Sequence, residues 1–129
     1  MKAIRYVRFG VPEQVLEVVD LPRPEPGPGQ VRIRLEASPC HIADLKHIRG
    51  LPWFDQYTPP HVAGYEGVGR ISALGAGVHG WREGERVFLP VRFGAWQEES
   101  LAEAARLWRA PERLDAAQLE IERPDRDDQ

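Results

Sequence analysis

One thiol and several imidazoles are the side chains of this sequence with the strongest metal-binding chemistry. Cys40 and His41 are adjacent, and His61 lies further along the chain. A thiolate and imidazoles are ligands that zinc accepts, so these three residues offer an improvised metal site. The alternative is a small packing cysteine beside two ordinary polar histidines. Because the chain has a single cysteine, an internal disulfide and a multi-cysteine zinc lobe are both excluded.

Phosphate binding is the second chemistry that the residue spacing suggests. Gly64, Gly67 and Gly69 form a Gly-x-x-Gly-x-Gly run that is typical of a phosphate-binding loop. Such a loop needs the N-terminus of a helix behind it. Residues 70–74 have a strand-like composition instead, so we expect the glycines to allow a bend and close backbone packing at a barrel corner.

The elements that must position these residues are mostly short strands. Apolar and charged residues alternate strictly from Val31 to Ala37, which predicts a half-buried strand with one wet face. Further strands are expected over 2–7, 16–20, 68–74, 86–89, 95–101 and 107–110, with a turn at 10–12. The proline-rich segment 21–29 is predicted to be an extended loop that wraps the barrel.

Two brief helices complete the expected secondary structure. One is predicted over 43–49 and ends at Gly50, and the other begins near Leu114 with Asp115 as its N-cap. Many short strands with one or two helices predict a mainly β barrel or sandwich. The charged segment 120–129 is expected to be a frayed tail, which leaves one domain over residues 1–119.

Composition narrows the class of protein and its partners. The chain of 129 residues is 42% hydrophobic and 29% charged, as in an ordinary soluble domain. Its net charge of -3, with both signs interleaved, provides no basic face for nucleic acid. The N-terminus lacks the apolar stretch of a signal peptide, and no apolar run is long enough to span a membrane. We therefore expect a cytoplasmic protein without nucleic-acid or membrane partners.

Several landmarks along the chain occur in an order and spacing shared with a known family. They are Leu21-Pro22-Arg23-Pro24, residues 29–34, 44–50 and 64–69, the stretch 73–77, Gly84-Glu85-Arg86-Val87, and residues 94–98. Together they resemble the N-terminal domain of the medium-chain dehydrogenase/reductase superfamily. The resemblance implies a GroES-like, partly open β-barrel, here without the Rossmann domain of that superfamily.

The resemblance also indicates whether a zinc site is expected in this chain. Zinc-dependent alcohol dehydrogenases carry a cysteine and a histidine where this chain has His41 and Tyr65. A tyrosine phenol is a poor zinc ligand near neutral pH, so we expect no zinc. The segment from Ala37 to Leu45 is more similar to the zinc-independent branch, which comprises quinone oxidoreductases and enoyl-thioester reductases.

Similarity to that branch implies reduction of an activated alkene or quinone by NADPH. A hydride goes to the β-carbon of the alkene, and an acid protonates the α-carbon. The branch's tyrosine acid corresponds in position to Trp53, whose indole donates a hydrogen bond but delivers no proton at useful pH. Tyr57 is the substitute acid, and for both residues aromatic packing is the alternative.

The same resemblance assigns five residues to the substrate cleft. They are His41, Asp44, Tyr65, Glu66 and Trp96. For Glu66 a structural hydrogen-bonding role is the alternative, and for Trp96 it is a place in the core.

No βαβ unit with a glycine-rich turn is recognised in the sequence. NADP(H), implied by the family, is therefore not expected to bind this chain alone. Three interpretations remain. The chain cooperates with a Rossmann-domain polypeptide, or it is a stand-alone module for a small ligand, or it is an assembly protein. Each predicts partner binding or self-association through the face that a Rossmann domain covers in the family.

Overall fold

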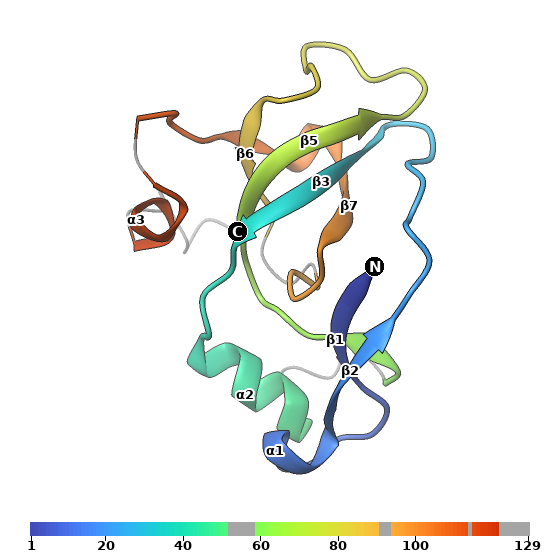
Figure 1. Cartoon of the computed structure of the whole chain (residues 1–129), viewed down its shortest axis with the longest axis vertical. Helices are drawn as coiled ribbons and strands as arrows, with labels where there is room; N and C mark the ends of the chain where they lie inside the picture. The colour runs from blue at the N-terminus through green and yellow to red at the C-terminus, as the bar shows by residue number, and fades with distance from the viewer. Residues whose placement is uncertain (52–58, 91–93, 114, 122–129) are drawn as a thin grey trace.

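The computed structural model describes residues 1–51, 59–90, 94–113 and 115–121, with the side chains of 120 and 121 left out. A five-stranded antiparallel sheet in the order β7-β3-β5-β6-β8 forms the larger part (Figure 1). Its strands are β3 (Gln30–Ala37), β5 (Val68–Leu74), β6 (Arg86–Phe88), β7 (Glu99–Glu103) and β8 (Trp108–Arg109). The strand expected from the alternation at 31–37 is therefore confirmed and lies between β7 and β5 in this sheet.

A second, three-stranded sheet lies at the other end of the molecule in Figure 1, in the order β2-β1-β4. It consists of β1 (Lys2–Tyr6), β2 (Leu16–Asp20) and β4 (His61–Val62). The first two strands match the predicted ranges closely, whereas β4 was not predicted. Every strand pair in the described residues is antiparallel, so these residues contain no βαβ unit.

The helices are short, as expected. They are α1 (Pro12–Val15), α2 (Ile42–Arg49) and α3 (Ala116–Ile121), with a 3-10 turn, η2 (Ala104–Arg106), before β8. The turn predicted at 10–12 continues into α1, because Pro12 supplies the backbone angle of a first helical residue. None of the helices in the described residues is long and apolar enough to cross a membrane.

The predicted C-terminal end of α2 and the predicted N-cap of α3 are confirmed. Gly50 stops α2 with a left-handed φ of 74°. Asp115 accepts a hydrogen bond from the backbone N–H of Gln118 at 2.8 Å, as an N-cap does. Leu119 of α3 is only 1% exposed and packs with Val68 and Phe88. The helix thus belongs to the packed body, and the domain boundary at residue 119 stays a prediction.

The glycines of the Gly-x-x-Gly-x-Gly run serve backbone packing. A Cβ on Gly69 would lie 2.2 Å from the carbonyl oxygen of Arg34, and one on Gly67 would lie 2.8 Å from Leu35. The β3–β5 register shifts at two irregularities, one of them between Leu35 and Ala37. Strand β5 begins within this run, at Val68, and no helix follows, so the close packing expected at a barrel corner is confirmed and these residues form no phosphate cradle.

Two predictions about strands were wrong in detail. The strand expected over 95–101 begins only at Glu99, because the preceding residues bond to two different partners. The Trp96 N–H donates to the carbonyl of Ala63 at 2.9 Å, and its own carbonyl accepts from Ile4 at 2.8 Å. In addition, Arg32 on the predicted wet face of β3 is only 6% exposed, since the proline-rich segment covers it.

Candidate functional site

The N-terminus of α2 brings His41 and Asp44 together in a capping box. The backbone N–H of His41 donates to Oδ2 of Asp44 at 2.7 Å, and the N–H of Ala43 donates to Nδ1 of His41 at 3.1 Å. These bonds satisfy backbone groups that the first turn of a helix leaves without partners. The helix start therefore fixes both side chains, and it engages the Nδ1 nitrogen of His41.

Asp44 is the buried carboxyl group of this region, with 2% of its surface exposed. Burial raises its pKa from the ordinary value of 3.8 to about 6, since a charged carboxylate is poorly solvated there. Hydrogen bonds from the backbone of His41 and Tyr65 oppose the rise, and the nearby carboxylate of Glu66 adds to it. The pKa of Asp44, at the start of α2, is therefore well above the usual value of an aspartate.

Several aromatic and imidazole rings lie close to one another in the region of Asp44. The ring of Tyr65 lies 5.5 Å from that of His41 and 6.3 Å from that of His47, centroid to centroid. His61 is 6.5 Å from His47, and burial lowers the pKa of its imidazole. The fold thus brings His41, Asp44 and Tyr65 together, with His47 and His61 in the same group of rings. Their role in a substrate cleft stays a prediction.

Glu66 is held inside the protein beside this group, with 1% of its surface exposed. Its backbone carbonyl accepts a hydrogen bond from Oγ of Ser38 at 2.6 Å. This bond joins the segment after β3 to the glycine-rich segment before β5. The electrostatic effect of Glu66 on Asp44 places both carboxyl groups in one region of the structure.

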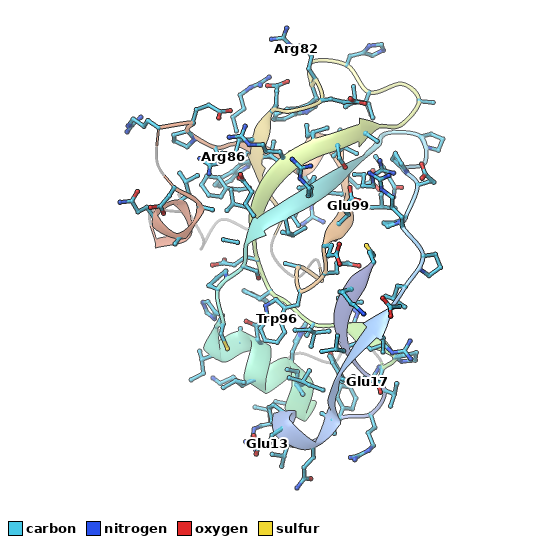
Figure 2. All side chains as sticks on the ribbon, in the orientation of Figure 1. Glu13, Glu17, Arg82, Arg86, Trp96 and Glu99 are labelled. Atoms are coloured by element: carbon cyan, nitrogen blue, oxygen red, sulfur yellow. The ribbon has the colours of Figure 1, made fainter. Side chains whose placement is uncertain are left out.

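Trp96 lines an apolar cavity of about 420 Å³ at the end of β3, which we name the head cavity. Its walls come from β1, β3, the segment after β3 and the segment before β7: Ile4, Leu35, Glu36, Ala37, Ser38, Cys40, Ala95, Trp96 and Gln97. Trp96 also packs against a buried cluster that includes Ile48 of α2, and Figure 2 shows it close to that helix. The volume is within the usual range for small-molecule sites, about 300–1,000 Å³.

The head cavity contains residues that sequence reasoning missed. Cys40 was expected to be a metal ligand or a small packing residue, yet its side chain is exposed and lines this cavity. Leu35 and Ala37 were recognised as strand residues, and their alternation in β3 was the available signal for an inward-facing wall. The two candidate catalytic residues, Trp53 and Tyr57, lie outside the described residues.

The improvised metal site is not formed by the described part of the chain. No group of three or more His, Cys, Asp or Glu side chains is arranged there to hold a metal ion. Cys40 borders the head cavity, whereas His61 lies beside His47 and Tyr6. The described residues therefore give no support to the hypothesis of a Cys40–His41–His61 site.

With the fold and these contacts established, comparison with known proteins identifies the family. The chain belongs to the alcohol dehydrogenase GroES-like domain family, whose model matches residues 27–112. The antiparallel barrel and brief helices are those of this family, which confirms the fold expected from the sequence resemblance.

The curated relatives include several enzymes and a protein named for the synaptic vesicle membrane. The synaptic vesicle membrane protein VAT-1 homolog of Rattus norvegicus is 40% identical over 92 residues, which cover 70% of this chain and 22% of the relative. An alcohol dehydrogenase of Rhizobium meliloti is 45% identical, with coverage of 64% and 23%. The mitochondrial enoyl-[acyl-carrier-protein] reductase of Arabidopsis thaliana is 37% identical, with coverage of 74% and 26%. The chain thus spans about a quarter of the length of these relatives.

Solved structures agree with these relationships. A human VAT-1 homolog-like protein superposes with a TM-score of 0.82 at 28% identity, covering 90% of this chain and 37% of that one. A mycobacterial protein solved in complex with NADPH gives a TM-score of 0.79 at 31% identity, with coverage of 90% and 35%. The homologues include quinone oxidoreductases and enoyl reductases of the zinc-independent branch, which confirms the resemblance inferred from the sequence.

Proposed function

We propose that this chain forms the substrate-side domain of a zinc-independent, NADPH-dependent oxidoreductase that reduces a quinone or an enoyl thioester. The observation that carries the proposal is the head cavity beside the capped start of α2, within a domain whose relatives include both enzyme types. Catalysis would require a nucleotide-binding domain, supplied by the same polypeptide or by another one.

The described residues support a role in binding and orientation. The apolar walls around Trp96 would exclude water from a conjugated carbonyl compound, and Cys40 and Ser38 border that space. At the start of α2, Asp44 accepts from the backbone N–H of His41, and the N–H of Ala43 donates to the ring of His41. NADPH, when bound, supplies the hydride. Within the described residues, the glycine run packs against Arg34 and gives the pyrophosphate no cradle.

Zinc independence is supported by the chemistry of two positions. His41 uses Nδ1 to cap α2, and Tyr65 offers a phenol where a zinc-dependent relative has an imidazole. We therefore propose that no zinc step takes place in this domain. The activity of an assembled enzyme should then be insensitive to a chelator.

A domain exchange tests the function directly. This chain would replace the corresponding domain of the mycobacterial quinone oxidoreductase, and NADPH oxidation would be followed with benzoquinone and with a crotonyl thioester. We expect reduction of at least one of the two. If the chimera binds NADPH and is folded but reduces neither compound, the proposal is wrong.

The same chimera tests which residue is the acid that protonates the α-carbon. We propose Tyr57 as the proton donor to the α-carbon and Trp53 as a neighbouring wall of the cleft. Tyr57→Phe should lower turnover of the crotonyl thioester by about 100-fold or more, since general acids contribute that much. Trp53→Phe is the matched aromatic control and should retain most activity. Equal turnover by Tyr57→Phe and the parent would remove Tyr57 from the mechanism.

A further inference from the structure

Two polar side chains that line the head cavity have no hydrogen left for a ligand. The Ser38 hydroxyl donates to the carbonyl of Glu66 at 2.6 Å. The Gln97 amide nitrogen donates to the carbonyl of Gly94 at 2.8 Å and to Oγ of Ser100 at 3.2 Å. A hydroxyl has one hydrogen and an amide nitrogen has two, so protein groups use all of them.

Trp96 brings a further donor to the same cavity. Its indole N–H can donate a hydrogen bond but cannot accept one, and no described residue accepts from it. The other side chains of the described lining are aliphatic, apart from the weakly donating thiol of Cys40 and the carboxylate of Glu36. The Trp96 N–H is therefore the strong side-chain donor of this lining that a ligand can use.

The carboxylate of Glu36 is engaged away from a ligand. Its Oε1 accepts from Nε of Arg86 at 2.8 Å, and its Oε2 lies 3.4 Å from Nε of Arg70. Two arginines thus compensate the charge of this wall, and the other lining side chains are uncharged. An apolar lining with one free N–H fits an uncharged ligand that has an acceptor oxygen, because a charged ligand would lose its hydration without a counter-charge.

The backbone and ring of Trp96 are held by several contacts. The Trp96 N–H donates to the carbonyl of Ala63 at 2.9 Å, and the Trp96 carbonyl accepts from the N–H of Ile4 at 2.8 Å. A Cβ on Gly64 would lie 2.8 Å from Cδ1 of the indole, so the ring packs directly on that backbone. The indole therefore has a fixed position beside the cavity.

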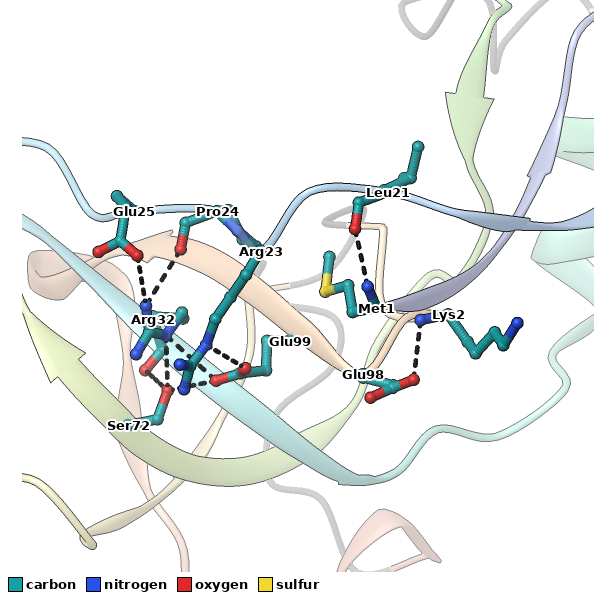
Figure 3. Close-up of polar contacts among 10 residues, drawn as sticks. All are labelled: Met1, Lys2, Leu21, Arg23, Pro24, Glu25, Arg32, Ser72, Glu98 and Glu99. Atoms are coloured by element: carbon teal, nitrogen blue, oxygen red, sulfur yellow. Dashed lines mark hydrogen bonds and ion pairs between the residues drawn. The ribbon is translucent and has the colours of Figure 1, made fainter.

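The segment that follows Trp96 is fixed as well, as Figure 3 shows. The backbone N–H of Lys2 donates to Oε1 of Glu98 at 2.7 Å. Arg23 of the proline-rich segment forms an ion pair with Glu99, with Nε and Oε1 2.7 Å apart. The donor is thus preorganised, which reduces the entropy that is lost when a ligand binds.

We propose that Trp96 positions the ligand of the head cavity by donating a hydrogen bond from its indole Nε1 to a carbonyl oxygen. The choice of a carbonyl compound rests on the proposed function, whereas the donor role rests on the contacts of the lining. In the assembled enzyme, hydride addition to the conjugated compound moves negative charge onto this oxygen, so the same N–H also favours the reduction.

Proton–nitrogen NMR spectra of the full chain test the donor role without a cofactor. Cyclohexanone is the probe, and methylenecyclohexane is the matched ligand of similar shape without the oxygen. The Trp96 indole signal, identified by its loss in Trp96→Phe, should move downfield and saturate with cyclohexanone only. The indole signals of Trp81 and Trp108, which do not border the head cavity, should stay in place.

Trp96→Phe keeps an aromatic ring and removes the donor. The ratio of cyclohexanone affinity to methylenecyclohexane affinity, measured by calorimetry, should fall about fivefold, as for the loss of one neutral hydrogen bond. Trp81→Phe is the matched variant and should keep the ratio of the parent. Trp81 borders a different cavity and lies under the guanidinium of Arg109, 4.3 Å from the ring centroid.

Three results would overturn the donor role: no saturable binding of cyclohexanone to the parent, binding that leaves the Trp96 signal in place, or an unchanged affinity ratio in folded Trp96→Phe. If Trp96→Phe does not fold, the Trp96 signal is assigned through its contacts with Ala63, and the parent titration decides alone. The chimera reports separately on the proposed function. A chimera that reduces neither compound, beside a Trp96 signal that moves, would reject the function and keep the donor role.

Discussion

At the scale of single residues, Asp44 combines a structural and an electrostatic role. It closes the capping box with His41, and burial raises the pKa of its carboxyl to about 6. The position of a helix start near residue 43 followed from spacing in the sequence, but the burial of Asp44 did not. The backbone of Tyr65 donates to Asp44 and the charge of Glu66 acts on it, and both residues are distant from Asp44 in sequence.

The raised pKa predicts a particular pH dependence of stability. The folded Asp44 keeps its proton to about pH 6, whereas the unfolded chain loses it near pH 3.8, so the folded state binds more protons between these values. The contribution of Asp44 to the free energy of unfolding is therefore largest below about pH 4 and is lost as the pH rises to about 6.

Urea unfolding of the parent and of Asp44→Asn, from about pH 4 to about pH 7, measures this contribution. Because Asn does not titrate, the parent should lose stability relative to the variant as the pH rises. Asp20→Asn removes an exposed carboxylate, paired with Lys2, and serves as the control. A parent-to-variant difference that stays constant over the range would contradict the assignment.

At the scale of elements, the packing of β3 against β5 depends on a glycine. Gly69 lies so close to β3 that a Cβ would meet the backbone of Arg34 at 2.2 Å. The sequence predicted a strand at the end of the glycine run, and from this we expected the glycines to allow close backbone packing. It could not show which of them faces a neighbouring backbone, since that depends on the register between strands far apart in sequence.

Gly69→Ala is expected to destabilise the fold by more than about 3 kcal/mol, because backbone atoms must move to admit the methyl group. Gly77 is the matched control. It has a φ of 78° and open space around its Cβ position, so Gly77→Ala should cost about 1 kcal/mol through backbone strain alone. Chemical denaturation of both variants gives the comparison. Equal losses in the two variants would show that the close approach to Arg34 does not matter.

At the scale of the whole molecule, α2 presents an apolar face to solvent. Ile42 is 66% exposed and Leu45 is 38% exposed, and the two are neighbours on one side of the helix. His41 caps the start of this helix, so this face lies beside the candidate site. We propose that it contacts a nucleotide-binding domain or, in its absence, a second copy of the chain.

Sedimentation velocity over a range of concentrations tests this proposal. The parent chain should associate as its concentration rises, and Ile42→Glu combined with Leu45→Glu should weaken the association. Val18→Glu is the control, because Val18 is 69% exposed on β2, away from α2. A parent that stays monomeric at every concentration argues against self-association through this face.

The mainly β class, most strand positions, the start and end of α2 and the family were predictable from the amino-acid sequence. These features depend on local alternation, capping residues and the order of landmarks, which the linear chain contains. The burial of Arg32, the position of Asp44 beside Tyr65 and Glu66, and the head cavity at Trp96 were not predictable in this way. Each of these depends on contacts between segments far apart in sequence, and no local pattern records which segments meet.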